Sequence, residues 1–271
     1  MDDGQTSGVP EGVDSSVAHP ARVYDVWLGG KDNYAADREA AEQAVAANPD
    51  ILPAVRANRA FLGRAVHYLA AEAGIDQFLD IGTGIPTANN THEVAQRARP
   101  SSRIVYVDND PVVLAHARAL LTSTPEGATG YLDADLRDVD TILDQAAEIL
   151  DLSRPVALML VAVLQYIGDD EDPYGIVTRL MDALAPGSHL VISHPASDVG
   201  AEKVAESMRR YNERAASSEQ ATPRTHAQIS RFFDGLELLE PGVVQLTEWR
   251  PGPGVTSTRR LPMWCGVARK P

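Results

Sequence analysis

FLDIGTGIPT, from Phe78 to Thr87, joins a short apolar run to a glycine-rich turn. The apolar side chains of Phe78–Ile81 predict a strand that is buried on both faces of a sheet. Gly82 and Gly84 allow the backbone to turn sharply and to approach a ligand closely, because neither residue has a Cβ atom. A helix is expected to begin shortly after Pro86. A strand, a glycine turn and a helix N-terminus in succession are typical of a nucleotide site in an open α/β sheet.

The spacing of the glycines helps to distinguish between nucleotides. A dinucleotide fingerprint has a third glycine or an alanine in G-x-G-x-x-G/A, whereas this chain has Thr87 there, after Pro86. That difference disfavours an NAD(P) site. An acidic residue followed by Gly-x-Gly is instead typical of an S-adenosylmethionine (SAM) site, although a glycine turn that binds no ligand also fits the pattern. The candidate cofactor-binding residues of this stretch are Asp80, Gly82, Thr83 and Gly84.

Two further strands are expected to end in acidic residues. RIVYVDND (103–110) places Asp108 at a carboxyl strand end, where ligands of such sheets bind, and there it could accept both ribose hydroxyls of SAM or NAD. YLDADLRD (131–138) adds Asp135, which we expect to accept from the adenine amino group. Together with Asp80, these carboxylates suit a positively charged sulfonium ligand. The candidates from these two stretches are Asp108, Asn109, Asp135 and Leu136.

Several longer motifs extend over nearly the whole chain. They are PARVYDVWLGGKDNYAADREAAE (20–42), FLDIGTGIPT (78–87), VYVDNDPVVLAHARALL (105–121), DADLRD (133–138), RPVALMLVAVLQYI (154–167), FFDGLELLEPGVV (232–244) and Trp249-Arg250-Pro251. In these motifs the chain resembles the actinobacterial S-adenosyl methyltransferase family, long described as a domain of unknown function. The resemblance implies a class I methyltransferase fold with SAM as cofactor, and it implies no particular methyl acceptor.

The resemblance also bears on two stretches outside the glycine turn. The loop GGKDNY (29–34) is expected to cover the cofactor and to help form the acceptor pocket, through Lys31 and Asn33. After the expected fourth strand, Val156–Val163, the chain has Gln165 where the resemblance leads us to expect a histidine or another aromatic ring. That departure affects activity if the side chain touches the acceptor or supplies a base.

Candidate catalytic residues follow from their places along the chain. A general base is needed only if the acceptor must lose a proton during methyl transfer. No Asp/Asn-Pro-Pro-Tyr stretch follows the fourth strand, which disfavours methylation of an amide or exocyclic base nitrogen of that type. Val161, near the end of that strand, is a further candidate for cofactor contact. The candidate bases are His194, expected just beyond a strand at His189–Ser193, and Tyr166, Tyr24 and Asp32.

These elements predict one compact α/β unit. We expect a Rossmann-like class I methyltransferase fold: a mostly parallel, seven-stranded sheet with helices on both faces and an N-terminal helical cap. Residues 1–19 are polar and glycine-rich and predict a disordered tail. Residues 20–74 are expected to form the cap, and residues 75–271 the SAM-binding core. The last three strands are expected at Glu237–Glu240, Val243–Glu248 and Leu261–Ala268.

Composition limits the classes of partner. The 271 residues carry a formal net charge of −14, which disfavours nucleic acid as a partner. Cys265 is the only cysteine, so neither an intramolecular disulfide nor a cysteine-based metal cluster is expected, and we predict no metal site. No signal peptide or membrane span is evident, so we predict a cytoplasmic protein. The acidic surface favours a small-molecule or protein acceptor over nucleic acid, and we predict a small molecule. Two alternatives remain open: a SAM-binding sensor without catalysis, and an NAD(P)-dependent oxidoreductase.

Overall fold

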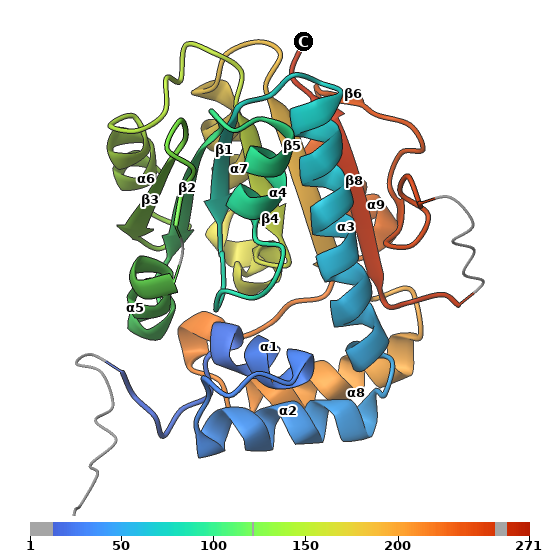
Figure 1. The fold of residues 1–271 in the computed structure, drawn as a ribbon. Coiled ribbons are helices and arrows are strands. Elements are labelled where there is room, and N and C mark those ends of the chain that lie inside the picture. The colour runs from blue at the N-terminus through green and yellow to red at the C-terminus, as the bar shows by residue number, and fades with distance from the viewer. Residues whose placement is uncertain (1–12, 121, 253–258) are drawn as a thin grey trace, which may run out of the picture.

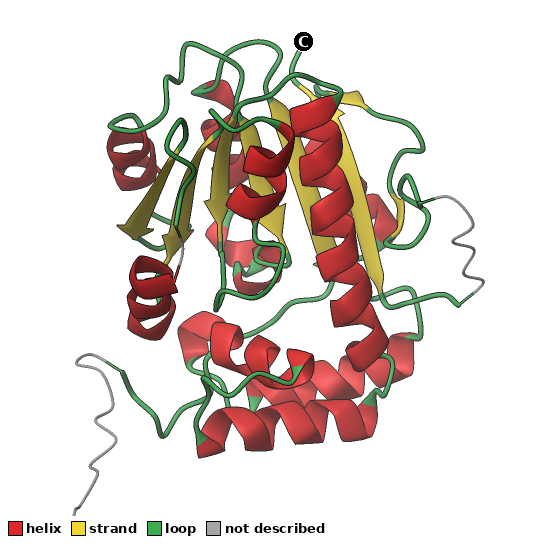
Figure 2. Ribbon diagram, viewed as in Figure 1, coloured by secondary structure: helices red, strands yellow, loops and turns green. Residues whose placement is uncertain are grey.

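The computed structural model describes residues 13–120, 122–252 and 259–271. Helices cover both faces of an eight-stranded sheet, and a further group of helices lies below its carboxyl edge (Figures 1 and 2). The strand order is β3-β2-β1-β4-β5-β8-β6, with β7 also paired to β8. The predicted α/β fold with a mostly parallel sheet is confirmed. Within the described ranges, no helix is long and apolar enough to cross a membrane.

Five parallel strands form the larger part of the sheet. They are β1 (Gln77–Ile81), β2 (Arg103–Asp108), β3 (Ala128–Asp133), β4 (Ala157–Val161) and β5 (His189–Pro195). The antiparallel strand β8 (Met263–Arg269) pairs along β5. The short strands β6 (Glu237–Leu238) and β7 (Val244–Gln245) both pair with β8. Both lie along the edge of β8 that faces away from β5, so the eight strands occupy seven positions across the sheet. The sequence predicted seven strands, and the structure has eight because two short strands share the last position.

The two faces of the sheet are covered by different helices (Figure 1). Helices α6 (Val139–Ala146) and α7 (Pro173–Asp182) pack on the face that carries Leu79 and Ile81. Helices α3 (Ile51–Ala71) and α4 (Thr91–Ala98) pack on the face that carries Phe78. Helix α5 (Pro111–Leu120) contacts β3, and the short helix α9 (His226–Ser230) precedes β6. Because successive side chains of a strand point to opposite faces, both faces of each central strand are apolar.

A helical cap lies below the carboxyl ends of the parallel strands (Figure 1). It consists of α1 (Pro20–Leu28), α2 (Ala35–Ala47) and α8 (Ala201–Asn212), and α8 packs along α2. Its small apolar core includes Val23, Ala41 and Tyr211. The cap therefore differs from the predicted contiguous segment 20–74 in two ways. It includes α8 from the second half of the chain, whereas α3 packs mainly on the sheet.

The two residues before α1 contact the cap. Ala18 is buried and forms an isolated bridge with Ala215, and the His19 backbone N–H donates to Asp37 Oδ1 over 2.9 Å. Asp37 also accepts from the Tyr34 backbone N–H through Oδ2, which completes a capping box at the start of α2. These contacts involve Ala18 and His19, the last two residues of the segment that was predicted to be a disordered tail, and for the rest of that segment the disorder stays a prediction. Residues 1–12 lie outside the described residues.

Candidate functional site

A large cleft lies where the strand order changes direction. Strands β1 and β4 are neighbours, yet the chain leads from β1 to β2 on one side and from β4 to β5 on the other. Ligands of open α/β sheets bind at such a switch point. The cleft is bordered by the carboxyl ends of β1, β2 and β4 and by α1 and α3, and it contains about 920 Å³ of empty space, its open mouth included. That space is large enough for a nucleoside-sized ligand.

The glycine turn after β1 forms the floor of this cleft. Gly82 and Gly84 have φ angles of 73° and 67°, a conformation that residues with a Cβ rarely adopt. A Cβ at Gly82 would lie 2.4 Å from Val163 Cγ2, whereas one at Gly84 would meet no atom within 4 Å. Gly82 is therefore required by packing, and Gly84 leaves its side of the turn open to a ligand. Thr83 fixes the turn, because its Oγ1 donates to the Asp80 carbonyl over 3.0 Å.

Asp80 lies under the turn with only 5% of its surface exposed. Its Oδ2 accepts a 2.6 Å hydrogen bond from Thr91 Oγ1 at the start of α4. Burial disfavours the charged carboxylate and raises the pKa of Asp80 to about 6, although the Thr91 hydrogen bond opposes the shift. The side chain borders the cleft. A carboxylate that is held but poorly solvated would gain from a positively charged ligand.

Asp108 at the end of β2 is joined directly to the glycine turn. Its Oδ2 accepts from the Gly84 backbone N–H over 2.8 Å, and its Oδ1 accepts from the Asp110 backbone N–H over 3.0 Å. Burial raises the pKa of Asp108, and these two backbone hydrogen bonds oppose the shift. The carboxylate is 8% exposed and borders the cleft. Each oxygen keeps further acceptor capacity, which is what two ribose hydroxyls would use.

The remaining predicted cofactor residues near the strand ends also border the cleft. Asn109 Nδ2 donates to Asp135 Oδ2 over 3.3 Å, and Arg137 pairs with Asp135 at 3.1 Å. Leu136 is buried, and Val161 at the end of β4 is half-buried. The structure thus brings the following predicted residues together around one cleft: Asp80, Gly82, Thr83, Gly84, Asp108, Asn109, Asp135, Leu136 and Val161.

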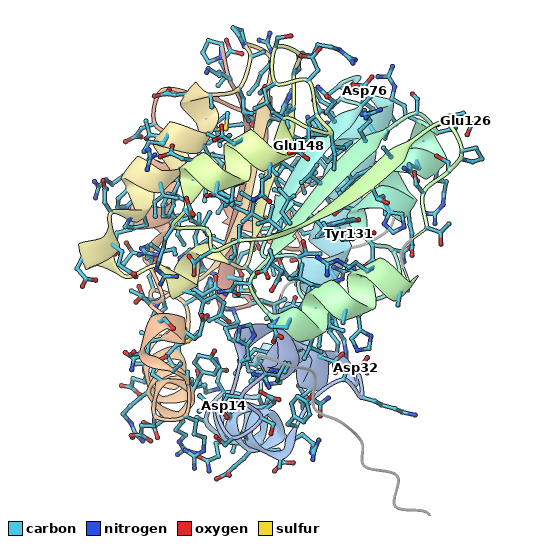
Figure 3. All side chains as sticks on the ribbon, turned by 90° about the vertical axis from the view of Figure 1, so that its left-hand side faces the viewer. Asp14, Asp32, Asp76, Glu126, Tyr131 and Glu148 are labelled. Atoms are coloured by element: carbon cyan, nitrogen blue, oxygen red, sulfur yellow. The ribbon has the colours of Figure 1, made fainter. Side chains whose placement is uncertain are left out.

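The loop between α1 and α2 does not reach this cleft. Lys31 is exposed, and Asn33 donates to Asp25 Oδ2 over 2.8 Å. Asp32 lies where the cap meets α5 (Figure 3), with His116 Nε2 3.5 Å from its Oδ1. None of these three residues is among those that border the cleft. The structure therefore gives no support to Lys31 and Asn33 as cofactor contacts or to Asp32 as a base.

His194 is a structural residue in this fold, contrary to its predicted catalytic role. Strand β5 runs on to Pro195, so His194 lies inside the sheet and is fully buried. Its Nε2 accepts from Arg224 Nη1 over 2.9 Å, which leaves Nδ1 to donate to the Pro195 carbonyl over 2.9 Å. Burial lowers the pKa of His194 to about 3. With both nitrogens occupied and no access to the cleft, the ring cannot take a proton from an acceptor.

Tyr24 and Tyr166 do border the cleft, from the cap and from the turn after β4. The Tyr24 hydroxyl accepts from Asn58 Nδ2 over 3.0 Å and donates to the Val55 carbonyl over 3.2 Å. Burial raises the pKa of both phenols, that of Tyr166 to about 12. Both side chains are therefore neutral at pH 7, which suits them to position an acceptor rather than to act as strong bases.

Two further residues of the cleft, His19 and Arg59, are not among the candidates that the sequence analysis named. Both border the cleft. His19 Nδ1 lies 2.9 Å from Asp110 Oδ2, and Arg59 Nη2 donates to the carbonyls of Ala88 and Asn89 over 3.2 and 3.3 Å. Burial lowers the pKa of His19, but its contacts with Asp110 outweigh this effect and raise it. The apolar residues Val17 and Ala18 just before His19 could have indicated that this segment packs on the protein, because apolar residues tend to be buried.

Residues 6–271 match a protein family that is described as S-adenosyl methyltransferase. The chain belongs to this family. The chain is similar to a DUF574 family protein from Streptomyces avermitilis, which is known from a crystal structure. The two sequences are 46% identical, the match covers 95% of this chain and 99% of that one, and the TM-score is 0.91. A proposed methyltransferase from Thermobifida fusca has 42% identity over 98% and 99% of the two chains, with a TM-score of 0.88.

More distant similarity supports the fold. The N-methyltransferase NodS from Bradyrhizobium japonicum has 18% identity over 83% of this chain and 98% of its own, with a TM-score of 0.50. No curated protein matches the chain. The family membership shows that the protein is a SAM-dependent methyltransferase, as the sequence predicted. The two alternatives, a SAM sensor and an NAD(P)-dependent oxidoreductase, receive no support from these comparisons.

The cleft of this methyltransferase fits SAM on two observations. Acidic side chains border it on several sides, including Asp80, Asp108 and Glu219, and such a cleft favours a sulfonium ion. Gly84 leaves the space above the turn free of protein atoms. Asp108 would hold the ribose, while Arg59 is the cleft's cation on the α3 side, where it could meet the carboxylate of the methionine moiety.

Proposed function

We propose that this methyltransferase transfers its methyl group to a small-molecule acceptor held between the cap and the sheet. The observation that carries the proposal is a second pocket that adjoins the cofactor cleft. Tyr24, Ala162 and Tyr166 border both spaces. A molecule in the second pocket would therefore lie next to the cleft that we assign to SAM, as direct methyl transfer requires.

The second pocket has the size and the lining of a small-molecule site. It contains about 670 Å³ of empty space, its open mouth included, and is bordered by all the helices of the cap together with the first turn of α3. Trp27 comes from α1, Ala44 from α2 and Met208 from α8, while Pro195 closes it from β5. A mostly apolar pocket with a few polar groups is typical of small-molecule recognition. The net charge of −14 adds to this, since it disfavours an acidic polymer as acceptor.

The roles of the side chains follow from their places. When bound, SAM supplies an activated methyl group on a charged sulfur. The protein's contribution is to hold the two reactants in contact and to exclude water. Asp80 and Asp108 provide the acidic floor, and Tyr24 is fixed between Asn58 and the Val55 carbonyl at the border of the two pockets. Neutral Tyr24 and Tyr166 would orient the acceptor at that border.

The test is transfer of a labelled methyl group from SAM to a panel of neutral small molecules, to a mixed protein fraction and to transfer RNA. We expect labelling of a small molecule only. The matched variant is Ala54→Phe, because Ala54 is buried and borders the second pocket but not the cofactor cleft. It should retain wild-type affinity for S-adenosylhomocysteine (SAH) and lose transfer. Labelling of protein or RNA alone, or full activity in Ala54→Phe, would contradict the proposal.

A further inference from the structure

Two polar side chains of the second pocket, Gln165 and Tyr211, are buried, with 5% and 3% of their surfaces exposed. Within the described part of the chain, Gln165 Oε1 accepts no hydrogen bond. The Tyr211 hydroxyl forms no hydrogen bond of good geometry either, and the Tyr166 side chain lies near enough to interact with it. Both residues border the second pocket. An unpaired buried polar group is costly, and it is seldom retained unless a ligand or water completes it.

The orientation of Gln165 is fixed by a contact on its other side. Its Nε2 donates to the Ala162 carbonyl over 2.7 Å, so Oε1 is the end of the amide that remains free. The residue itself is held in the turn after β4, where its carbonyl accepts from the Thr222 backbone N–H over 2.8 Å. The pocket therefore presents a hydrogen-bond acceptor in a fixed direction. The side chains of Gln165 and Tyr211 both interact with Tyr166, which borders both pockets, so they lie near the border with the cofactor cleft.

The rest of the pocket limits the charge of its ligand. None of the described residues that border it is charged. Burying an ion there would leave it without a counter-charge, which is strongly unfavourable. The pocket thus selects a molecule that is neutral and mainly apolar.

From these observations we propose that Gln165 and Tyr211 recognise an N–H or O–H group of a neutral, mainly apolar acceptor. The Gln165 oxygen accepts from that group, and the Tyr211 hydroxyl provides a second hydrogen bond. This proposal rests on the proposed function, since it assigns the acceptor to the second pocket. It makes the two residues specificity determinants rather than members of the reacting pair.

The test uses indole, 1-methylindole and indole-3-carboxylate as probes, titrated by ligand-observed NMR into the protein saturated with SAH. Indole has an N–H group, 1-methylindole lacks it, and the carboxylate adds a charge to the same ring. We expect indole to bind roughly fivefold more tightly than 1-methylindole, as one hydrogen bond in a dry site provides, and the carboxylate not to bind. Gln165→Met should remove the preference, and Tyr211→Phe, which deletes only the hydroxyl, should reduce it.

Met208→Leu is the control, because it changes an apolar wall of the same pocket and should keep the preference. Equal binding of indole and 1-methylindole, or a preference that survives in both Gln165→Met and Tyr211→Phe, overturns the proposal. If Ala54→Phe abolishes probe binding but no N–H preference is seen, the pocket assignment stands and only the recognition pair fails. If no probe binds, or if Ala54→Phe leaves binding unchanged, the proposed acceptor pocket fails as well.

Discussion

Replacing the buried carboxylate under the glycine turn should stabilise this methyltransferase. Asp80 borders the cofactor cleft, and burial holds its pKa at about 6 against an ordinary value of 3.8. In Asp80→Asn the charge is removed while an amide oxygen remains to accept the hydrogen bond from Thr91. The variant therefore isolates the free-energy cost of keeping this acid ionised inside the protein.

The size and the sign of the effect follow from the two pKa values. At 1.36 kcal/mol per pH unit, the interval from 3.8 to about 6 corresponds to ~3 kcal/mol. Between about pH 4 and pH 6 the folded protein retains a proton that the unfolded chain has released, so the free energy of unfolding falls as the pH rises. The cost is absent below about pH 4 and fully present above about pH 6. Asp80→Asn should thus match wild type near pH 4 and exceed its stability by ~3 kcal/mol near pH 7.5.

Urea unfolding of both proteins across this pH range measures the difference. For a chain of this size the gain near neutral pH corresponds to roughly 5–10 °C in melting temperature. Asp133→Asn is the matched control, because Asp133 ends β3 at the same edge of the sheet but is exposed, and it should change stability by less than ~0.5 kcal/mol at any pH. An Asp80→Asn variant that is less stable than wild type at pH 7.5, or a difference that does not vary with pH, would refute the reasoning.

Three further predictions concern the cofactor cleft and its support. Asp108→Asn should weaken SAH binding by about tenfold or more in calorimetry, because one charge-assisted hydrogen bond contributes ~1.5–3 kcal/mol. Asp133→Asn should bind SAH as wild type does. Equal affinities for all three proteins would exclude Asp108 from the cofactor site. Gly82→Ala should lower the melting temperature, because the new Cβ would lie 2.4 Å from Val163 Cγ2 and the residue has a positive φ angle. An unchanged melting temperature would show that the Val163 side chain can move aside without a cost in stability. His194→Gln should lower the free energy of unfolding in urea by ~1–3 kcal/mol, since a hydrogen bond to a buried arginine is disturbed. SAH affinity should stay unchanged. A variant that keeps full stability but loses SAH affinity would show that His194 belongs to the functional site.

The cofactor cleft could largely be predicted from the sequence because its residues follow directly from strand ends. Asp80 and Asp108 each occupy the last or the penultimate position of a buried apolar run. Parallel strands bring their carboxyl ends to one edge, so the order of the strands places such residues together without knowledge of their contacts. The same reasoning failed for His194 through a small error in strand length. β5 continues to Pro195, two residues beyond its predicted end, and this turned a residue at the mouth into one inside the sheet.

The acceptor pocket could not be derived in that way. Helix α8 has a marked apolar side, and its sequence pattern indicates that it packs on something, but periodicity does not identify the partner. That partner is α2, more than 150 residues earlier in the chain. The unpaired oxygen of Gln165 was equally hidden, because a glutamine in a sequence gives no sign of which end of its amide is occupied.

The two-part construction of the cap has a consequence for protein engineering. Most of the residues that line the proposed acceptor pocket belong to two blocks, residues 24–55 and residues 195–221, and strands β1 to β4 lie between these blocks in the sequence. Gln165 and Tyr166 line it from the turn after β4. If only one block were exchanged with that of a relative, the two blocks would come from different proteins and their contacts would not match, such as the bridge between Ala18 and Ala215. We therefore expect that the shape of this pocket can be transferred between relatives only when both blocks are exchanged together, while residue 165 is a further determinant of acceptor preference.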